Sequence, residues 1–225
     1  MFCSELASRL HCYVVAGYPE ALPPDECCTR ENSSGGTPDS WNIVGANSAV
    51  LYGPVGEWVG GYRKTNLFMT DLPWAKAGRS NQSASKSGLN IILGTGFATF
   101  HLPAPLGKLT IGICMDLNPR IPEWYLEDGP YELADYCVSE NVNTVVLCNA
   151  WLDSRKGGED DGDTDLQTVR YWAARLRPLW TDDNDHAPNS SSKLPKQGAH
   201  SDTIVIACNR TGFEKGKCIK TNHFK

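Results

Sequence analysis

The residue best placed to do chemistry in this sequence is a cysteine at the end of an apolar run. The run LTIGIC is rich in β-branched residues and ends at Cys114, and Asn118-Pro119 follows shortly after it. Because proline disfavours a helical conformation in the residue before it, the strand is expected to give way to a turn here. A nucleophile at such a corner is held rigidly and points outward, and the backbone N–H of Met115 is then placed to stabilise an oxyanion.

A thiol needs a neighbouring cation or base to attack well at neutral pH, because its own pKa is about 8.5. Lys64, at the end of the apolar segment EWVGGYRK, is the candidate partner: it would donate to the developing oxyanion and favour the thiolate. Each of the two residues also has an ordinary structural interpretation. A cysteine in an apolar strand is more often part of the core, and a lysine at a strand end is more often a solvated surface charge.

The elements that must position these residues can be read from the hydrophobic pattern. Short apolar runs with turn-rich spacers predict strands, two pairs of which form hairpins, while apolar residues at helical spacing predict helices. The predicted elements are buried strands at 12–17 and 202–209, hairpins of 47–54 with 57–64 and of 97–102 with 108–114, a strand at 143–151, and helices at 131–140 and 166–180. Strands mixed with helices indicate a layered α/β protein, which we expect to be one domain over residues 1–225.

Both ends of the sequence look incomplete. The segment SELASRL predicts the last part of a helix that feeds the first strand, but no strand precedes it, and the chain stops soon after the strand at 202–209. We therefore expect a partial domain.

Net charge, apolar segments and cysteine usage limit the kinds of partner and compartment that the sequence predicts. The 225 residues carry a net charge of −5, whereas binding to nucleic acid needs a basic face. No apolar stretch is long enough to cross a membrane, and the N-terminus lacks the pattern of a signal peptide. The nine cysteines contain no CxxC pair, which argues against a zinc site or a redox dithiol. An odd cysteine count, with several cysteines inside apolar runs, predicts a reducing compartment, cytosolic or nuclear.

Several segments together resemble the nitrilase, or carbon–nitrogen hydrolase, superfamily in their order and spacing. They are GYRKTNLF, GTGFATFHLPAPLGKLTIGICMDLNPRIPE, TVVLCNAWLDS and IVIACNRTGFEKG. Within the superfamily, CYVVAGYPE, ICMDLNP and AWLDS are most similar to the fungal protein N-terminal amidases. The resemblance implies a four-layer αββα sandwich, here incomplete at both termini, with no metal and no organic cofactor. It also implies deamidation of N-terminal Asn or Gln of proteins and peptides to Asp or Glu, the step that opens an N-degron pathway.

The resemblance assigns roles to individual residues. Cys114 forms a thioester and releases ammonia, and Lys64 supports the oxyanion. The third member of the triad, a glutamate that acts as general base, belongs upstream of everything in this sequence. Glu20 follows the strand that normally comes after the glutamate-bearing one, so it is not assigned. Superfamily members commonly pair, which makes a homodimer the default expectation.

Three residues are candidates for substrate binding. An acidic residue often follows the lysine in the superfamily, and Asp71 is the nearest one here; it either positions Lys64 or the substrate, or lies in solvent. Trp151 and Asp153 follow a predicted strand, and an anionic group there would suit a substrate's α-ammonium. Core packing is the alternative for Trp151. For the whole chain, two alternatives stay open: a catalytically inactive nitrilase-fold fragment or pseudoenzyme with a binding role, and a cysteine-rich structural or redox protein.

Overall fold

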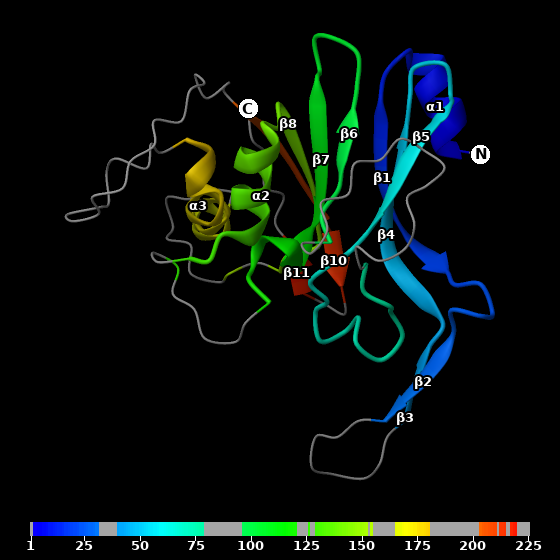
Figure 1. Cartoon of the computed structure of the whole chain (residues 1–225). Helices are drawn as coiled ribbons and strands as arrows, with labels where there is room; N and C mark the ends of the chain where they lie inside the picture. The colour runs from blue at the N-terminus through cyan, green and yellow to red at the C-terminus, as the bar shows by residue number, and fades with distance from the viewer. Residues whose placement is uncertain are drawn as a thin grey trace. The chain divides into compact units, whose positions relative to one another are not determined.

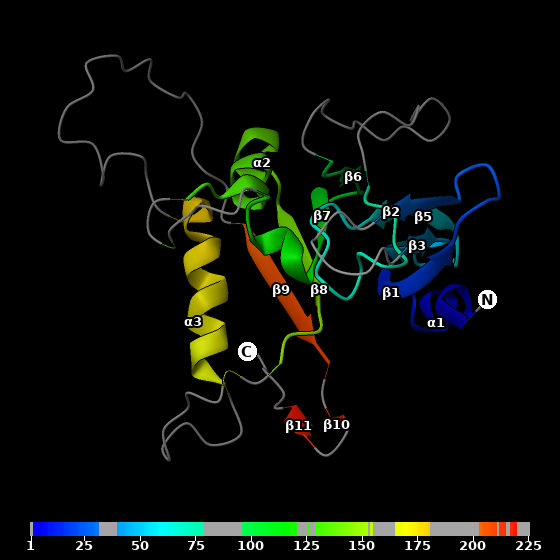
Figure 2. The same cartoon turned by 90° about the horizontal axis from the view of Figure 1, so that it is seen from below.

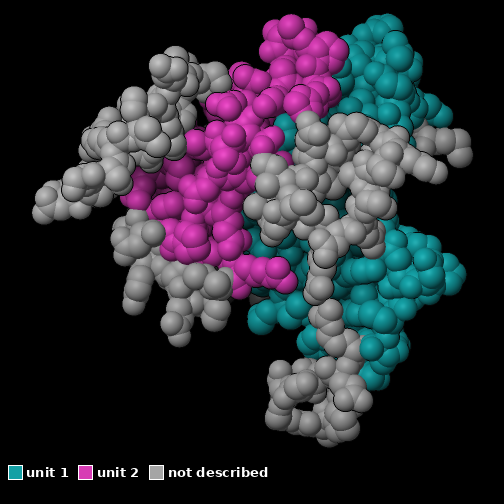
Figure 3. All heavy atoms as spheres, in the orientation of Figure 1, with its two compact units in different colours: residues 1–100, 111–116 teal, residues 101–110, 117–225 magenta. Residues whose placement is uncertain are grey.

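The computed structural model describes residues 2–31, 40–78, 96–120, 126, 129–152, 154, 165–180, 203–210, 212–214 and 217–219. The chain divides into two compact units, residues 1–100 with 111–116 and residues 101–110 with 117–225 (Figure 3). It passes from one unit to the other within the strands β6 (Thr99–His101) and β7 (Lys108–Ile113), and again after Asp116. Each unit is described by itself, and the single domain expected from the sequence stays a prediction.

The first unit is built on a three-stranded antiparallel sheet in the order β1-β4-β5 (Figure 1). Its strands are β1 (Val14–Ala21), β4 (Gly45–Tyr52) and β5 (Trp58–Arg63). A tight turn joins the last two, with Gly56 at a φ of +84° and the N–H of Gly53 donating to the carbonyl of Glu57 at 2.9 Å. The predicted hairpin is therefore confirmed, and it ends where Lys64 begins the next segment.

Two further elements belong to this unit. The helix α1 (Phe2–Leu10) packs on β1 and β4 and is tied to the hairpin turn by Ser4, whose Oγ donates to the carbonyl of Gly56 at 2.7 Å (Figure 2). A second hairpin, β2 (Cys28–Glu31) with β3 (Ser40–Ile43), follows β1 and precedes β4. The sequence predicts a polar loop that reaches to Ser40, and that prediction is wrong for β2, which lies inside it. The two strands pair with each other in a two-stranded sheet of their own.

The second unit contains two parallel strands covered by helices. β8 (Thr144–Asn149) and β9 (Ile204–Asn209) pair residue for residue in a sheet of order β6-β7-β8-β9. The helices α2 (Glu132–Glu140) and α3 (Leu166–Arg175) lie on the same face of these strands (Figures 1 and 2). The short strands β10 (Gly212–Glu214) and β11 (Lys217–Ile219) pair with each other. The predicted helix at 131–140 and strand at 143–151 are confirmed.

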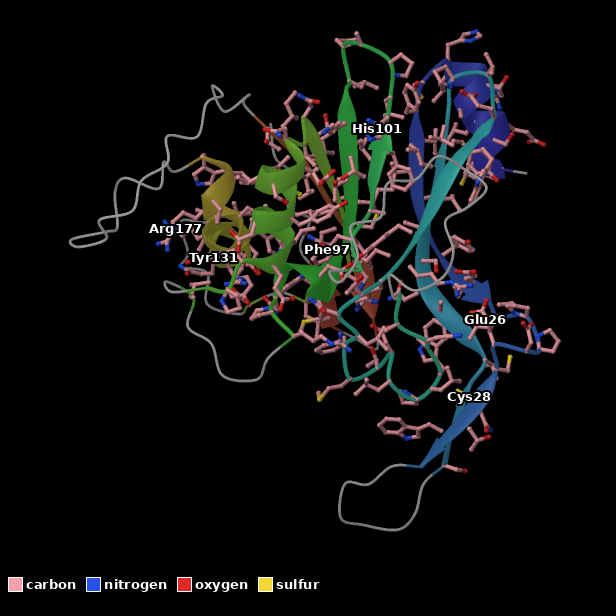
Figure 4. The ribbon with its side chains drawn as sticks, in the orientation of Figure 1. Glu26, Cys28, Phe97, His101, Tyr131 and Arg177 are labelled. Carbon is pink, nitrogen blue, oxygen red and sulfur yellow. The ribbon has the colours of Figure 1, made fainter. Side chains whose placement is uncertain are left out.

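The helix predicted at 166–180 ends earlier than expected. α3 stops at Arg175 and is followed by the 3-10 turn η3 (Arg177–Leu179), because Pro178 has no N–H to continue the helical ladder. The side chain of Asp165 caps the other end by accepting the N–H of Thr168 at 3.1 Å. Beyond the helix, an Arg177 guanidinium nitrogen donates to the hydroxyl of Tyr131 at 2.6 Å (Figure 4).

Two strands predicted to be buried are only half-buried. Residues of β9 alternate between exposed and intermediate, with Ile204 62% and Ile206 46% exposed. β1 is likewise partly exposed and lies at an edge of its sheet. An apolar run predicts a strand, but it does not reveal whether a second layer covers both of its faces. Among the described helices, none has the length and apolar character needed to cross a membrane.

Candidate active site

The cysteine singled out by the sequence lies at a strained corner. β7 ends at Ile113, and Cys114 opens the 3-10 turn η1 (Cys114–Leu117) with a φ of +49°. A left-handed conformation costs a non-glycine residue roughly 1–2 kcal/mol, so it persists only where the surroundings impose it. The strand-to-turn corner predicted from the sequence is confirmed, and it has the strained backbone expected of a nucleophile elbow. Cys114 is partly exposed, and Met115 follows it in the same turn.

Lys64 and Asp71 form a buried ion pair. Lys64 follows β5 directly, and its Nζ lies 2.6 Å from Oδ2 of Asp71, with side-chain exposures of 3% and 7%. The Asp71 carboxylate also accepts the N–H of Phe68 at 2.9 Å and Nδ2 of Asn47 at 3.2 Å. The alternatives in which Lys64 is a solvated surface charge and Asp71 a loop residue in solvent are therefore wrong. Asp71 holds the lysine.

A second carboxylate, Asp116, was not identified from the sequence. It is fully buried, and its two oxygens accept four hydrogen bonds. Oδ1 accepts the backbone N–H groups of Thr65 at 3.0 Å and Asn66 at 2.8 Å, while Oδ2 accepts the hydroxyl of Tyr62 and the N–H of Ile113, both at 2.8 Å. The signal in the sequence was an acidic residue inside an apolar run, two positions after the cysteine. Such a residue needs internal partners.

Asp116 joins the segment that carries the lysine to the segment that carries the cysteine. Thr65 follows Lys64 in the chain, and Ile113 precedes Cys114. The Asp116 carboxylate accepts the backbone N–H groups of Thr65 and Ile113. The backbone nitrogens of Thr65 and Ile113 therefore lie no more than about 8 Å apart. Burial raises the pKa of Asp116 to about 6, although its hydrogen bonds and the nearby Lys64 ammonium act in the opposite direction.

Glu20 takes part in a different group of charges. Its carboxylate accepts Ser48 Oγ at 2.7 Å and both Nε and Nη2 of Arg63, at 2.8 and 2.6 Å. Arg63 also contacts Glu26, which in turn accepts the Lys76 ammonium at 3.1 Å (Figure 4). Burial raises the pKa of Glu20, but the hydrogen bonds from Arg63 and Ser48 outweigh it and lower the value overall. Glu20 is thus held by arginine and serine, in keeping with its not being assigned as the general base.

The candidate substrate-binding residues Trp151 and Asp153 follow β8. Trp151 belongs to the second unit, where its ring lies 5.2 Å from that of Tyr171 and 6.3 Å from that of Trp172. The backbone of Trp151 exchanges two hydrogen bonds with the side chain of Asn209, at 2.8 and 3.1 Å. These contacts give Trp151 a packing role, and its role toward substrate stays a prediction. Asp153 lies outside the described residues.

The described residues also bear on metal binding. Within the part of the chain that the structure describes, no group of three or more His, Cys, Asp or Glu side chains is arranged to hold a metal ion. The described groups of the site are a thiol, a buried ammonium and two buried carboxylates.

Comparison with known proteins finds relatives that are similar to this chain in sequence. No protein-family model matches the chain. In sequence it is 27% identical over 227 residues to a protein N-terminal amidase of Schizosaccharomyces pombe, which covers 95% of this chain and 61% of that protein. A protein N-terminal amidase of Saccharomyces cerevisiae is also 27% identical, over 66% of this chain and 28% of its own length. The chain thus spans about three fifths, or less, of these relatives.

Solved structures show the fold. An N-terminal amidase determined with an Asn-Glu-Ala peptide matches 97% of this chain and 70% of its own, with a TM-score of 0.59 and 18% identity. A carbon–nitrogen hydrolase from Helicobacter pylori G27 matches 97% of this chain and 55% of its own, with a TM-score of 0.50 and 17% identity. The predicted nitrilase-type fold class is confirmed. The chain has the fold of the nitrilase, or carbon–nitrogen hydrolase, type and is similar in sequence to two fungal protein N-terminal amidases.

Proposed function

We propose that this chain is an amidohydrolase that converts N-terminal Asn or Gln of proteins and peptides to Asp or Glu. The observation that carries the proposal is the strained Cys114, whose segment is joined through Asp116 to the segment of the buried Lys64–Asp71 pair. Two comparisons support the substrate class. The relatives similar over most of this chain are N-terminal amidases, and the structural neighbour of the same fold was solved with an Asn-Glu-Ala peptide.

The proposed chemistry uses groups of the chain in two steps. Cys114 gives its thiol proton to the general-base glutamate that the resemblance implies, and the thiolate attacks the carbon of the side-chain carboxamide. The Lys64 ammonium and the N–H of Met115 stabilise the negative charge that develops on the oxygen. The C–N bond then breaks, and the glutamate returns the proton to the nitrogen, which leaves as ammonia and yields the thioester. Water then hydrolyses the thioester, which yields the carboxylic acid and restores the thiol. Because Asp71 holds the ammonium at 2.6 Å, Lys64 is prepositioned before substrate arrives.

The compartment follows from the same chemistry. A cysteine nucleophile works only while it is reduced, so we propose that the protein acts in the cytosol or the nucleus, where thiols stay reduced and an N-degron pathway would receive its product. The homodimer and the general-base glutamate stay predictions of the family resemblance.

A second candidate function is binding without turnover. One observation favours it. The described carboxylates that contact the lysine and cysteine segments belong to two aspartates, Asp71 and Asp116, whereas the proposed chemistry needs a glutamate as general base. Glu20 is instead held by Arg63 and Ser48. A chain of this fold that binds an N-terminal Asn or Gln but does not release ammonia would be the pseudoenzyme considered from the sequence.

The test is ammonia release from short peptides that begin with Asn or Gln. The controls are the same peptides with acetylated N-termini, which remove the α-ammonium, and the Cys114→Ala variant. Release that requires both the free N-terminus and Cys114 is the expected result. Release that survives Cys114→Ala, or that is equal for acetylated peptides, would overturn the proposal. Saturable peptide binding without release would instead establish the binding role.

A further inference from the structure

The hydrogen bonds around the buried carboxyl group of Asp116 allow two arrangements of protons. Its Oδ2 lies 2.8 Å from the hydroxyl of Tyr62, and that hydroxyl also lies 3.1 Å from Oγ1 of Thr65. A phenol has one proton and can donate to only one of these acceptors. The Thr65 hydroxyl cannot donate to Tyr62 at the same time, because its own proton goes to the carbonyl of Gly96 at 3.0 Å.

Two arrangements satisfy this network. When Asp116 is ionised, Tyr62 donates to it. When Asp116 is protonated, it donates to the Tyr62 oxygen, and Tyr62 donates to Thr65. In both arrangements Asp116 still accepts the N–H groups of Thr65, Asn66 and Ile113, so the backbone links do not change while the buried charge does.

The network is closely packed at its outer end. Gly96 has a φ of +80°, and a Cβ built there would lie 2.7 Å from Oγ1 of Thr65. The absence of a side chain at this position lets the carbonyl approach the threonine hydroxyl. The proton of Thr65 is thereby directed away from Tyr62, and the choice of arrangement is left to Asp116.

We propose that Asp116 is the positioning residue of the proposed amidase reaction: it fixes the cysteine turn against the lysine segment and carries the buried proton whose loss changes the charge beside Lys64. The proposal rests on the proposed function for its effect on turnover, but its effect on the thiol of Cys114 is independent of it. The charged or titratable groups around Asp116 are Lys64 with its partner Asp71, Tyr62 on β5, and Cys114 two residues away.

The variant that isolates this role is Asp116→Asn. An asparagine can keep the Thr65 and Asn66 links through its carbonyl oxygen and can donate to Tyr62 through its nitrogen. That nitrogen then faces the N–H of Ile113, donor against donor, so the link on the cysteine side is lost. The charge and the titration are lost as well. Because misplacing a reacting group by about 1 Å costs up to roughly 100-fold, we expect kcat to fall about 10- to 100-fold with KM nearly unchanged.

The companion variant is Tyr62→Phe, which removes one donor to Asp116 and leaves the three backbone links. Since the Tyr62 hydrogen bond stabilises the ionised carboxylate, its loss raises the pKa of Asp116 further. An inflection that the wild type shows near pH 6 should therefore move to higher pH in Tyr62→Phe and vanish in Asp116→Asn. The control is Asp165→Asn, which changes a buried aspartate of the second unit and shows what a general loss of stability does to the two pH profiles.

The experiment measures two pH profiles on the full chain. One is kcat for ammonia release; the other is the rate of alkylation of Cys114 by iodoacetamide, resolved from the other cysteines by peptide mass spectrometry. The inference is overturned if Asp116→Asn keeps the acid inflection of Cys114 alkylation, or keeps wild-type kcat. If the wild type alkylates with the inflection but releases no ammonia, the proposed function fails and the role of Asp116 stands.

Discussion

Asp71→Asn is the change that most directly tests how the candidate site is held. The ammonium of Lys64 and the carboxylate of Asp71 are 3% and 7% exposed and 2.6 Å apart, so solvent screens them little. Asparagine removes the countercharge and leaves the ammonium buried. Breaking a buried pair in this way costs about 3–5 kcal/mol, a large part of the stability of a typical domain. Urea unfolding followed by tryptophan fluorescence measures the loss.

The double variant Lys64→Met with Asp71→Asn separates folding from chemistry. It removes both charges, and neutral replacement of a buried pair is often close to neutral for stability. We expect its free energy of unfolding to return to within about 1–2 kcal/mol of the wild type, while ammonia release is lost because the lysine is gone. The reasoning is refuted if Asp71→Asn unfolds within about 1 kcal/mol of the wild type, or if the double variant is as unstable as the single one.

Three other predictions concern single positions. Cys114→Gly relieves a φ of +49° and should raise the free energy of unfolding by roughly 1 kcal/mol while abolishing ammonia release, which paired unfolding and activity assays would show. Asp165→Ala removes the cap of α3 and should cost about 1–2 kcal/mol at pH 7 in urea unfolding. Burial raises the pKa of Asp165, but its hydrogen bonds outweigh this and hold it near 2, so the stability it contributes is full above about pH 4 and is lost as pH falls toward 2. For Asp116 the pKa is raised to about 6, so the sign is opposite. Its contribution to the free energy of unfolding should be fully present below about pH 4 and lost as pH rises through 6. Unfolding measured against pH should show this step in the wild type and not in Asp116→Asn.

The strand-and-turn framework of the site was predictable because local signals specify it. Two apolar segments on either side of a short turn predicted the hairpin that delivers Lys64, and Asn118-Pro119 predicted the break after Cys114. Each of these signals involves only a few neighbouring residues, and in both places the turn residues and the adjacent apolar segment predict the same local structure. The same reasoning failed for β2, because the strand Cys28–Glu31 contains no apolar run that would mark it.

The interactions inside the site were less predictable. The sequence placed Asp71 near Lys64 but left it between a solvated loop and a partner of the lysine, because burial is a property of the tertiary structure. Asp116 was passed over since its four donors come from positions as far apart as Tyr62 and Ile113. An acidic residue in an apolar run always requires such donors, and searching for them is the step that sequence reasoning can add.

The two buried carboxylates divide the work of holding the site. Asp71 neutralises the ammonium of Lys64 by a direct contact, which fixes the side chain. Asp116 binds backbone N–H groups on both sides, which fixes the two segments whatever their side chains are. A strained φ at Cys114 can persist only if its neighbours are fixed, and the link from Asp116 to Ile113 supplies that constraint one residue away. Loss of Asp71 should therefore act first on stability, whereas loss of Asp116 should act first on the geometry and the pH response of the thiol.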